Sequence, residues 1–221
     1  MRKIILGTTQ RCPRCRLTPR WCVCAGERAV ATPLAIDVIT HAREHFRPSS
    51  TGALIARVCP GARLHVWRDD AAVAREAVRR DGRELWILHP SGEPMPAGAR
   101  PEDVQLVLLD GSWSEASTIA QRIAGWGRRV SLPMTGESRY WLRAQQDGAR
   151  YSTAEALLFL LESFGLRDAR DVLRVQFELH VYAGLRARGR KELAEEFLAE
   201  SPLRAALPEL IAAMNVVRPR T

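Results

Sequence analysis

Apolar residues gather into short runs that predict the buried strands of a sheet. Segments 33–41 (PLAIDVITH), 84–88 (ELWIL) and 104–109 (VQLVLL) are each almost continuously apolar. Strands of this kind usually lie inside a parallel sheet whose two faces are both covered by helices. Shorter strands are predicted at 63–67 and 128–132.

Between and after these runs, apolar positions recur with the spacing of an amphipathic helix. In segment 171–188 they form one stripe, made of Val172, Val175, Leu179 and Tyr182. Segment 91–103, rich in proline and glycine, is expected to be a surface loop. Alternating strands and helices predict an α/β domain with a mostly parallel sheet and a helical C-terminal section. The expected helices span 51–59, 70–80, 112–124, 152–164, 171–188, 191–200 and 203–214.

Four of the five cysteines fall within residues 12–24 and have the spacing of metal ligands. The apolar stretch at the start of the chain is too short for a signal peptide, so a disulfide framework is not expected. A tetrahedral zinc ion with a structural role fits four thiolates, which leave no coordination position open. A reduced cluster without metal, or redox pairs, are the alternatives. The predicted ligands are Cys12, Cys15, Cys22 and Cys24, whereas Cys59 is expected to be a packed thiol.

We therefore expect a zinc-binding module at 1–32, followed by an α/β domain with C-terminal helices at 33–221. The chain of 221 residues carries 33 Lys plus Arg against 25 Asp plus Glu, and only Lys3 and Lys191 are lysines. Arginine suits phosphate recognition because its planar guanidinium grips two oxygens at once, although arginine can equally fill solvated faces. The excess of arginine favours an RNA partner. No apolar run is long enough to span a bilayer, so a cytoplasmic protein is expected.

Three polar motifs follow apolar runs at the points where the predicted strands end. The first runs from His41 through Glu44 to Gly52, and the second is 110–113 (DGSW). The third joins 138–143 (SRYWLR) to 151–156 (YSTAEA). In open α/β sheets, ligands bind beyond the carboxyl ends of the strands, where helix N-termini present free N–H groups. The motifs are therefore expected to build one binding site.

In this order and spacing, the motifs resemble the DTW-domain family. That family shows C-x-x-C…C-x-C, then His-x-x-Glu…Thr-Gly, Asp-x-Thr-Trp, Ser-Arg-Tyr…Leu-Arg and Ser-Thr-x-Glu-Ala. Two positions depart from its pattern: Ser112 replaces the threonine of the Asp-x-Thr-Trp motif, and Ser50 stands where many relatives have asparagine. Neither change removes a charge, so activity is expected to survive.

The resemblance implies a SPOUT-like fold with a knotted S-adenosylmethionine site. It also implies transfer of the 3-amino-3-carboxypropyl group of that co-substrate to N3 of a uridine in tRNA, which releases methylthioadenosine. A SPOUT-type RNA methyltransferase and a non-catalytic, zinc-containing RNA-binding protein are the alternatives. Ribosomal RNA is an alternative substrate, and the chain is expected to be a monomer.

Roles for single residues follow from the chemistry of this transfer. Asp110 either accepts the N3 proton of the uridine, or has a structural role as the N-cap of the helix that starts near Ser112 or as an acceptor for backbone N–H groups. Trp113 either stacks on a base or anchors the core, and Ser112 completes the predicted catalytic set. Arg139 either binds a carboxylate or phosphate or forms an ion pair. The expected cofactor-binding residues are Thr51, Gly52, Leu109, Gly111, Ser138, Arg139, Tyr140, Ser152 and Thr153.

The remaining polar residues receive more general expectations. His41 and Glu44 either contact the ribose or order their loop, and the three histidines outside any motif (His65, His89 and His180) are expected to be structural. Arginines are expected to hold the RNA phosphates. Those arginines are Arg11, Arg14, Arg16 and Arg20 beside the cysteines and Arg143 and Arg150 beside the third motif.

Overall fold

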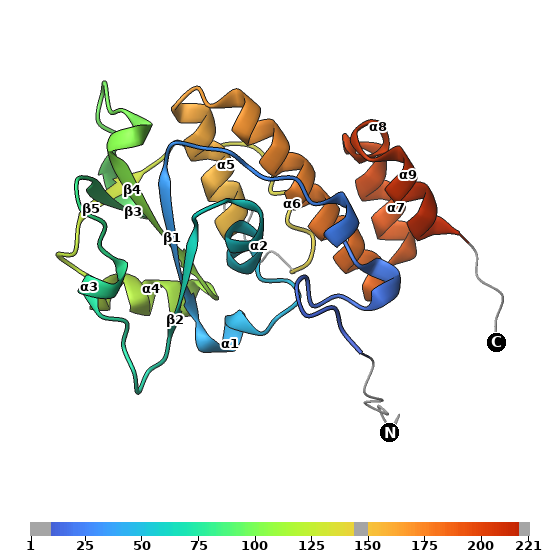
Figure 1. Ribbon diagram of the computed structural model, residues 1–221, viewed down its shortest axis with the longest axis horizontal. Coiled ribbons are helices and arrows are strands. Elements are labelled where there is room, and N and C mark those ends of the chain that lie inside the picture. Colours follow the sequence, from blue (N-terminus) through green and yellow to red (C-terminus); the bar gives the residue numbers. More distant parts are fainter. Residues whose placement is uncertain (1–9, 144–149, 217–221) are drawn as a thin grey trace.

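A five-stranded parallel sheet forms the centre of the computed structural model, which describes residues 10–143 and 150–216 (Figure 1). The strand order is β2-β1-β4-β3-β5, and every neighbouring pair runs parallel. The predicted α/β class, the parallel sheet and the helical C-terminal section are therefore confirmed. The strands are β1 (Ala35–His41), β2 (Arg63–Trp67), β3 (Glu84–Pro94), β4 (Val104–Asp110) and β5 (Arg128–Ser131).

Helices cover both faces of the sheet, which explains the continuous apolar runs of β1 and β4. Ile36 and Val38 of β1 belong to the core shared with α2 (Thr51–Val58), α5 (Thr153–Ser163) and α6 (Arg167–Ala187). Ile39 belongs to a second core, on the side of α3 (Arg75–Val78) and α4 (Trp113–Arg122). Because successive side chains of a strand point to opposite faces, a strand covered on both sides is apolar at most of its positions.

One charged residue, Asp37, interrupts the apolar character of β1 and is fully buried. Its carboxylate accepts hydrogen bonds from Arg63 Nε at 2.7 Å, Arg80 Nε at 2.9 Å and Gln105 Nε2 at 2.9 Å, and His65 Nε2 lies 2.8 Å away. Burial acts to raise the pKa of Asp37, but the bonds from His65, Arg63 and Arg80 outweigh it and lower this pKa to about 2. The expectation that His65 is structural fits this network.

The helix predicted at 70–80 is wrong in length, because α3 comprises only Arg75–Val78. Arg68 and Ala71 form an isolated bridge that keeps the preceding segment out of the helix. After α3 the backbone is extended, and the N–H of Arg80 donates to Gln105 Oε1 at 2.9 Å. Tertiary hydrogen bonds to the buried Asp37 network have therefore overridden the local helical pattern.

Other boundaries also differ from the sequence prediction, and α6 begins at Arg167, before the predicted residue 171. Strand β3 continues to Pro94 into the predicted loop, after a register shift, and pairs there with β5. Gly92 permits this close pairing, since a Cβ atom at this position would lie 2.6 Å from the Val130 backbone. The helix predicted at 203–214 is divided into α8 (Leu203–Ala206) and α9 (Pro208–Asn215), because Pro208 disfavours a helical conformation at the residue before it.

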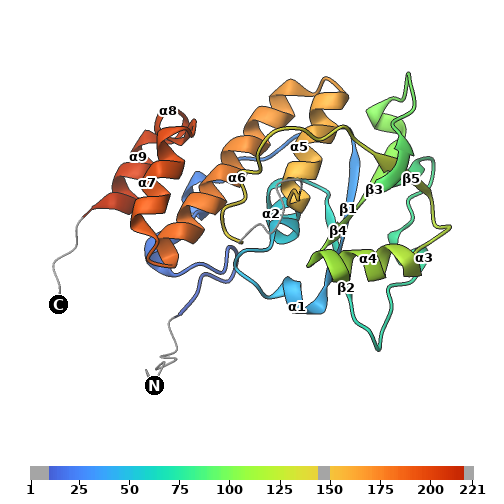
Figure 2. The ribbon, with the colours of Figure 1, turned by 180° about the vertical axis from the view of Figure 1, so that it is seen from behind.

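The N-terminal segment and the last helices both pack on α6 (Figures 1 and 2). Gln176 of α6 donates to the Gly26 carbonyl at 3.1 Å, and the Arg186 guanidinium lies 4.7 Å from the Trp21 ring. Residues on both sides of the expected boundary between 1–32 and 33–221 thus belong to one continuous hydrophobic core. The remaining elements are η1 (Pro19–Trp21), η2 (Cys24–Gly26), α1 (Ala42–His45), η3 (Pro101–Asp103) and α7 (Lys191–Ala199).

Within the two described ranges, no helix is long and apolar enough to cross a membrane.

Candidate active site at the carboxyl edge of the sheet

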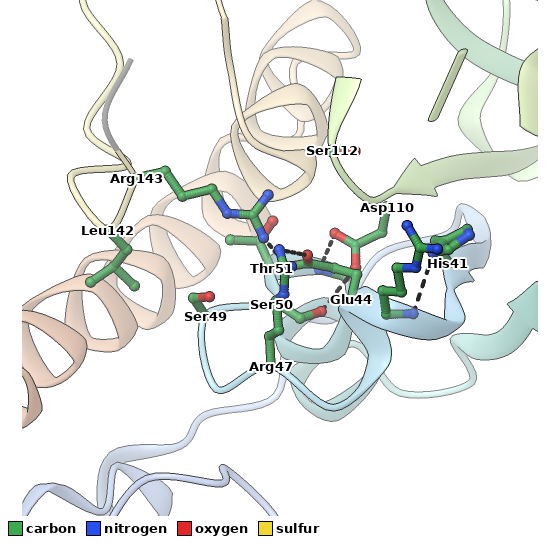
Figure 3. A network of polar contacts seen from close by, with 12 residues as sticks. His41, Glu44, Arg47, Ser49, Ser50, Thr51, Asp110, Ser112, Leu142 and Arg143 are labelled. Atoms are coloured by element: carbon green, nitrogen blue, oxygen red, sulfur yellow. Dashed lines mark hydrogen bonds and ion pairs between the residues drawn. The ribbon is translucent and has the colours of Figure 1, made fainter. Parts of the chain in front are cut away.

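Asp110, the last residue of β4, brings the three polar motifs together (Figure 3). Its Oδ2 accepts hydrogen bonds from the hydroxyls of Thr40 at 3.0 Å and Ser50 at 2.9 Å. Its Oδ1 accepts from the Gly52 N–H at 3.1 Å and from the Thr153 hydroxyl at 2.9 Å. One buried carboxylate therefore connects the end of β1 and the starts of α2 and α5 to β4.

These contacts use the whole hydrogen-bonding capacity of the Asp110 carboxylate. An ionised carboxylate offers about four lone-pair positions, and four donors already occupy them. Asp110 does not cap α4, because Ser112 does so in a reciprocal capping box with Glu115. The geometry favours Asp110 as a residue that positions the site.

A second carboxylate, Glu155, organises the third motif. Glu155 forms a capping box with Ser152 at the start of α5 and accepts a hydrogen bond from the Ser138 hydroxyl at 2.9 Å. The neighbouring Tyr140 hydroxyl donates to the Ser49 carbonyl at 2.6 Å. The segment 138–140 is thereby fastened both to α5 and to the loop that precedes α2.

Arg139 has its contacts on the side of the C-terminal helices. Its guanidinium donates to the Phe197 carbonyl at 2.8 Å and to Glu200 at 3.1 Å, and lies 4.0 Å from the Phe197 ring centroid. Glu178 lies 3.6 Å from the same guanidinium. Of the two roles expected for Arg139, the ion pair is the one that these contacts form.

A cavity of about 430 Å³ opens beside Asp110, at the carboxyl ends of β3, β4 and β5. This volume lies within the range of roughly 300–1,000 Å³ that small-molecule sites usually have. Gly52, Ser138 and Arg139 are not among the residues that line the cavity. The predicted site residues in its lining are Thr51, Leu109, Asp110, Gly111, Ser112, Trp113, Tyr140, Ser152 and Thr153.

Part of the lining was not identified from the sequence. Leu88, His89 and Pro90 of β3 and Leu132 and Met134 after β5 also face the cavity. The signal that could have found them is their place at or just after the end of a predicted strand, since the carboxyl ends of parallel strands meet at one edge. His89 was expected to be structural, yet it lines the cavity, where burial and the charge of Arg129 lower its pKa.

Glu44 is a second buried carboxylate of the cavity wall. Its side chain forms hydrogen bonds with Arg47 at 3.1 Å and with Arg143. Burial raises the pKa of Glu44, the charge of Arg143 opposes this effect, and the charge of Asp110 adds to it. The net effect of these opposing causes is a raised pKa for Glu44.

Of the two roles expected for His41, its described contacts fit the ordering of its loop. Its Nδ1 accepts a hydrogen bond from the Arg43 N–H at 3.3 Å, at the start of α1. The same nitrogen lies 3.2 Å from Glu115, and Nε2 lies 3.7 Å from Asp69. The ring thus orders the junction between β1 and α1 next to α4.

The comparison with known families agrees with this arrangement. The DTW domain model matches residues 9–183, which include every motif that converges on Asp110. The chain belongs to the DTW domain family. This family is associated with tRNA aminocarboxypropyltransferase activity. No solved structure matches the chain.

Trp113 gives the DTW site an aromatic surface at its entrance. It is the first residue of α4, lines the cavity and remains 43% exposed. The Arg150 guanidinium lies 5.5 Å from the Trp113 ring centroid. A ring with this exposure is not a core anchor, and its face can stack on a planar ligand.

The four N-terminal cysteines of this DTW protein form a cluster that could hold a metal ion. Their sulfur atoms all lie within 4.8 Å of one another, with 3.7 Å between Cys12 and Cys24 and between Cys15 and Cys22. Four ligands placed tetrahedrally at a Zn–S distance of about 2.3 Å would be about 3.8 Å apart. The cluster therefore has the dimensions of a zinc site.

Backbone hydrogen bonds favour the thiolate form of one of these cysteines, which is the form that binds a metal. The pKa of Cys12 is lowered to about 6, mainly by a hydrogen bond from the Cys15 backbone, with burial opposing the shift. Burial instead raises the pKa of Cys22 and Cys24. A cation at the centre of the cluster would compensate for the burial of these two thiolates. Burial alone raises the pKa of Cys59 to about 12, as expected for a packed thiol outside the cluster.

Proposed function

We propose that this DTW-domain protein transfers the 3-amino-3-carboxypropyl group of S-adenosylmethionine to N3 of a uridine in tRNA, releasing methylthioadenosine. The observation that carries this proposal is the convergence of all three DTW motifs on Asp110, beside a cavity of about 430 Å³. Such a cavity at the carboxyl edge of a parallel sheet is where a nucleoside-containing ligand would bind.

The reaction requires positioning and one proton transfer. The bound S-adenosylmethionine would supply a carbon that its sulfonium activates. The bond from N3 to this carbon forms as the carbon–sulfur bond breaks, sulfur keeps the electron pair, and the N3 proton leaves to a base. The cavity wall would determine which group is transferred, by holding the aminocarboxypropyl carbon, and not the methyl group, in line with N3.

We assign proton acceptance to Glu44 and positioning to Asp110. The Asp110 carboxylate is occupied by four donors, whereas each Glu44 oxygen has one described hydrogen bond. The raised pKa of Glu44 brings its basicity closer to what general-base catalysis near neutral pH needs. Trp113 would stack on the target base or on the adenine.

We infer that Cys12, Cys15, Cys22 and Cys24 bind one structural zinc ion. The spacing of their sulfur atoms supports tetrahedral coordination. Leu17, Trp21 and Val23, around the cluster, belong to the hydrophobic core that includes α6. The ion would therefore hold the N-terminal segment against the catalytic part of the chain.

We infer a SPOUT-like arrangement for the segment that joins β5 to α5. Met134, Tyr140, Arg143, Tyr151 and other residues of this segment contribute to the cavity wall, so the chain turns around the site before it enters α5. The knot that the family resemblance implies stays a prediction, as does the monomeric state. The net charge of +8 supports a tRNA partner.

Nucleoside mass spectrometry tests the proposed activity directly. Unmodified tRNA is incubated with the purified protein and S-adenosylmethionine, once with a label in the carboxyl carbon and once with a label in the methyl group. We expect the carboxyl label in a modified uridine and the methyl label in methylthioadenosine. Methyl label in the RNA, together with S-adenosylhomocysteine, would show a methyltransferase instead. Absence of any label in RNA, with tRNA binding retained, would favour a non-catalytic RNA-binding protein.

A further inference from the structure

Phe46 is an aromatic residue that the structure leaves in solvent. It is the C-cap residue that follows α1, lies two residues after Glu44 of the cavity wall, and is 69% exposed. No other large apolar side chain in the described ranges has a higher exposed fraction. A single exposed apolar residue is ordinary, so the case for a ligand rests on the charged group that lies beside this ring.

Two side chains contact this ring but leave most of it exposed. The guanidinium of Arg16 lies 5.6 Å from the Phe46 ring centroid, and the His45 ring meets it edge-on at 4.7 Å. Arg16 comes from the cysteine segment, which runs beside the loop that follows α1 in both views (Figures 1 and 2). The N-terminal segment and the first motif thus build one surface together.

The position of Arg16 is set by its backbone. It has a φ of 61°, the only positive φ of a non-glycine residue within the described ranges, and its N–H donates to the Cys12 carbonyl at 2.8 Å. Its buried Nη1 has no hydrogen-bond partner among the described residues. The tight turn of the cysteine cluster therefore places a guanidinium against an exposed aromatic ring.

A second pair of an exposed aromatic ring and a guanidinium lies at the cavity itself. Trp113 is also exposed, and the Arg150 guanidinium lies over its ring at 5.5 Å. Paired aromatic and guanidinium groups suit unpaired nucleotides, because the ring stacks on any base and the cation attracts the phosphate. The net charge of +8 favours a polyanion over a protein partner.

We propose that Phe46 and Arg16 form a stacking platform for an unpaired base of the RNA, outside the cavity that receives the target uridine. The platform rests on the proposed function in that its ligand is the RNA substrate. The cysteine segment would then contact RNA directly, in addition to supporting the fold. Single-stranded loops supply such unstacked bases.

Equilibrium binding of an unmodified tRNA transcript, without S-adenosylmethionine, tests the platform. Phe46→Ala and Phe46→Leu should each weaken binding by roughly 5- to 100-fold, which corresponds to the loss of one base–aromatic stack. Phe46→Trp should retain wild-type affinity, because it keeps a π face. Leu193→Ala, which removes another exposed apolar side chain far along the sequence on α7, serves as the control and should bind like wild type.

Arg16→Gln separates the contribution of the cation. It should weaken binding and lower the slope of log affinity against log salt by about 0.7 to 0.9, the value for one phosphate contact, while Phe46→Leu leaves the slope unchanged. The exposed Arg204→Gln is the matched control.

Two results would overturn the platform. If wild type binds tRNA and Phe46→Leu binds as tightly, the platform is wrong while the proposed function stands. If wild-type protein does not bind tRNA, the platform and the proposed function fail together.

Discussion

The N–H of Gly52 donates to the Asp110 carboxylate at 3.1 Å, and the two residues approach so closely that position 52 has no room for a side chain. A Cβ atom at this position would lie 2.5 Å from the carboxyl carbon of Asp110. Gly52 belongs to the first turn of α2, whose free N–H groups and positive dipole end favour a buried anion. The glycine is required here for close approach.

Gly52→Ala should therefore lower the free energy of unfolding, by about 1–3 kcal/mol, because the new methyl group displaces Asp110. Chemical denaturation measures this change. The same substitution in an Asp110→Ala background should lose most of its effect, which a double-mutant cycle reveals. Alanine normally stabilises a helix relative to glycine, so an increase in stability would show that position 52 has space.

Asp110→Asn should reduce both stability and affinity for S-adenosylmethionine. The amide keeps only one acceptor oxygen, so two of the four present donors lose their acceptor, with an effect of about 1–3 kcal/mol. Thermal unfolding and calorimetric titration with the co-substrate measure the two quantities. The exposed Asp171→Asn on α6 is the control. A loss of turnover of roughly 100-fold with unchanged affinity and stability would instead identify Asp110 as the base.

Glu44→Gln should lower kcat while largely preserving the affinity for S-adenosylmethionine. A general base acts in its deprotonated form, so the wild-type rate should fall as the pH decreases through the raised pKa of Glu44. The variant should have lost this acidic limb of the pH–rate profile. If the residual activity of Glu44→Gln keeps the wild-type acidic limb, Glu44 only orders Arg47 and Arg143.

Removal of zinc should loosen the segment before Pro33 and leave the sheet folded. Elemental analysis of freshly purified, unchelated protein should give close to one zinc ion per chain, and Cys22→Ser should reduce this value. Hydrogen exchange after chelation should increase around Leu17 and Trp21, which pack in the core with α6. Cys59→Ala should keep the full zinc content. A zinc content well below one per chain in untreated wild type would contradict the assignment.

Asp37 should make the protein sensitive to acid in a defined range. Its pKa is about 2 in the folded protein and about 3.9 in an unfolded chain, so it stabilises the fold above pH 4. This contribution, about 2–3 kcal/mol, should disappear as the pH falls from about 4 to 2. Denaturation of wild type and Asp37→Asn across this range measures it. An equal pH dependence in both proteins would show that another carboxylate is responsible.

Local sequence predicted the strands and the meeting of the polar motifs at one edge of the sheet. Apolar runs such as VQLVLL in β4 can be buried only between two covered faces, and polar residues directly after them must lie at the carboxyl edge of the sheet. The spacing of the four cysteines predicted their cluster in the same way, because ligands close in sequence are close in space. Helix lengths were less accessible where tertiary bonds compete, as the shortened α3 shows.

The sequence by itself thus determined the α/β class, the parallel sheet, the cysteine cluster and the motifs at strand ends. Only the tertiary structure decided which atoms of those motifs meet. The partners of Asp110 lie 43 to 70 residues away from it along the chain, and Arg139, from the same motif as Tyr140, has its side chain on α7. The physical reason is that side-chain direction depends on how distant elements pack, and no local periodicity encodes that packing.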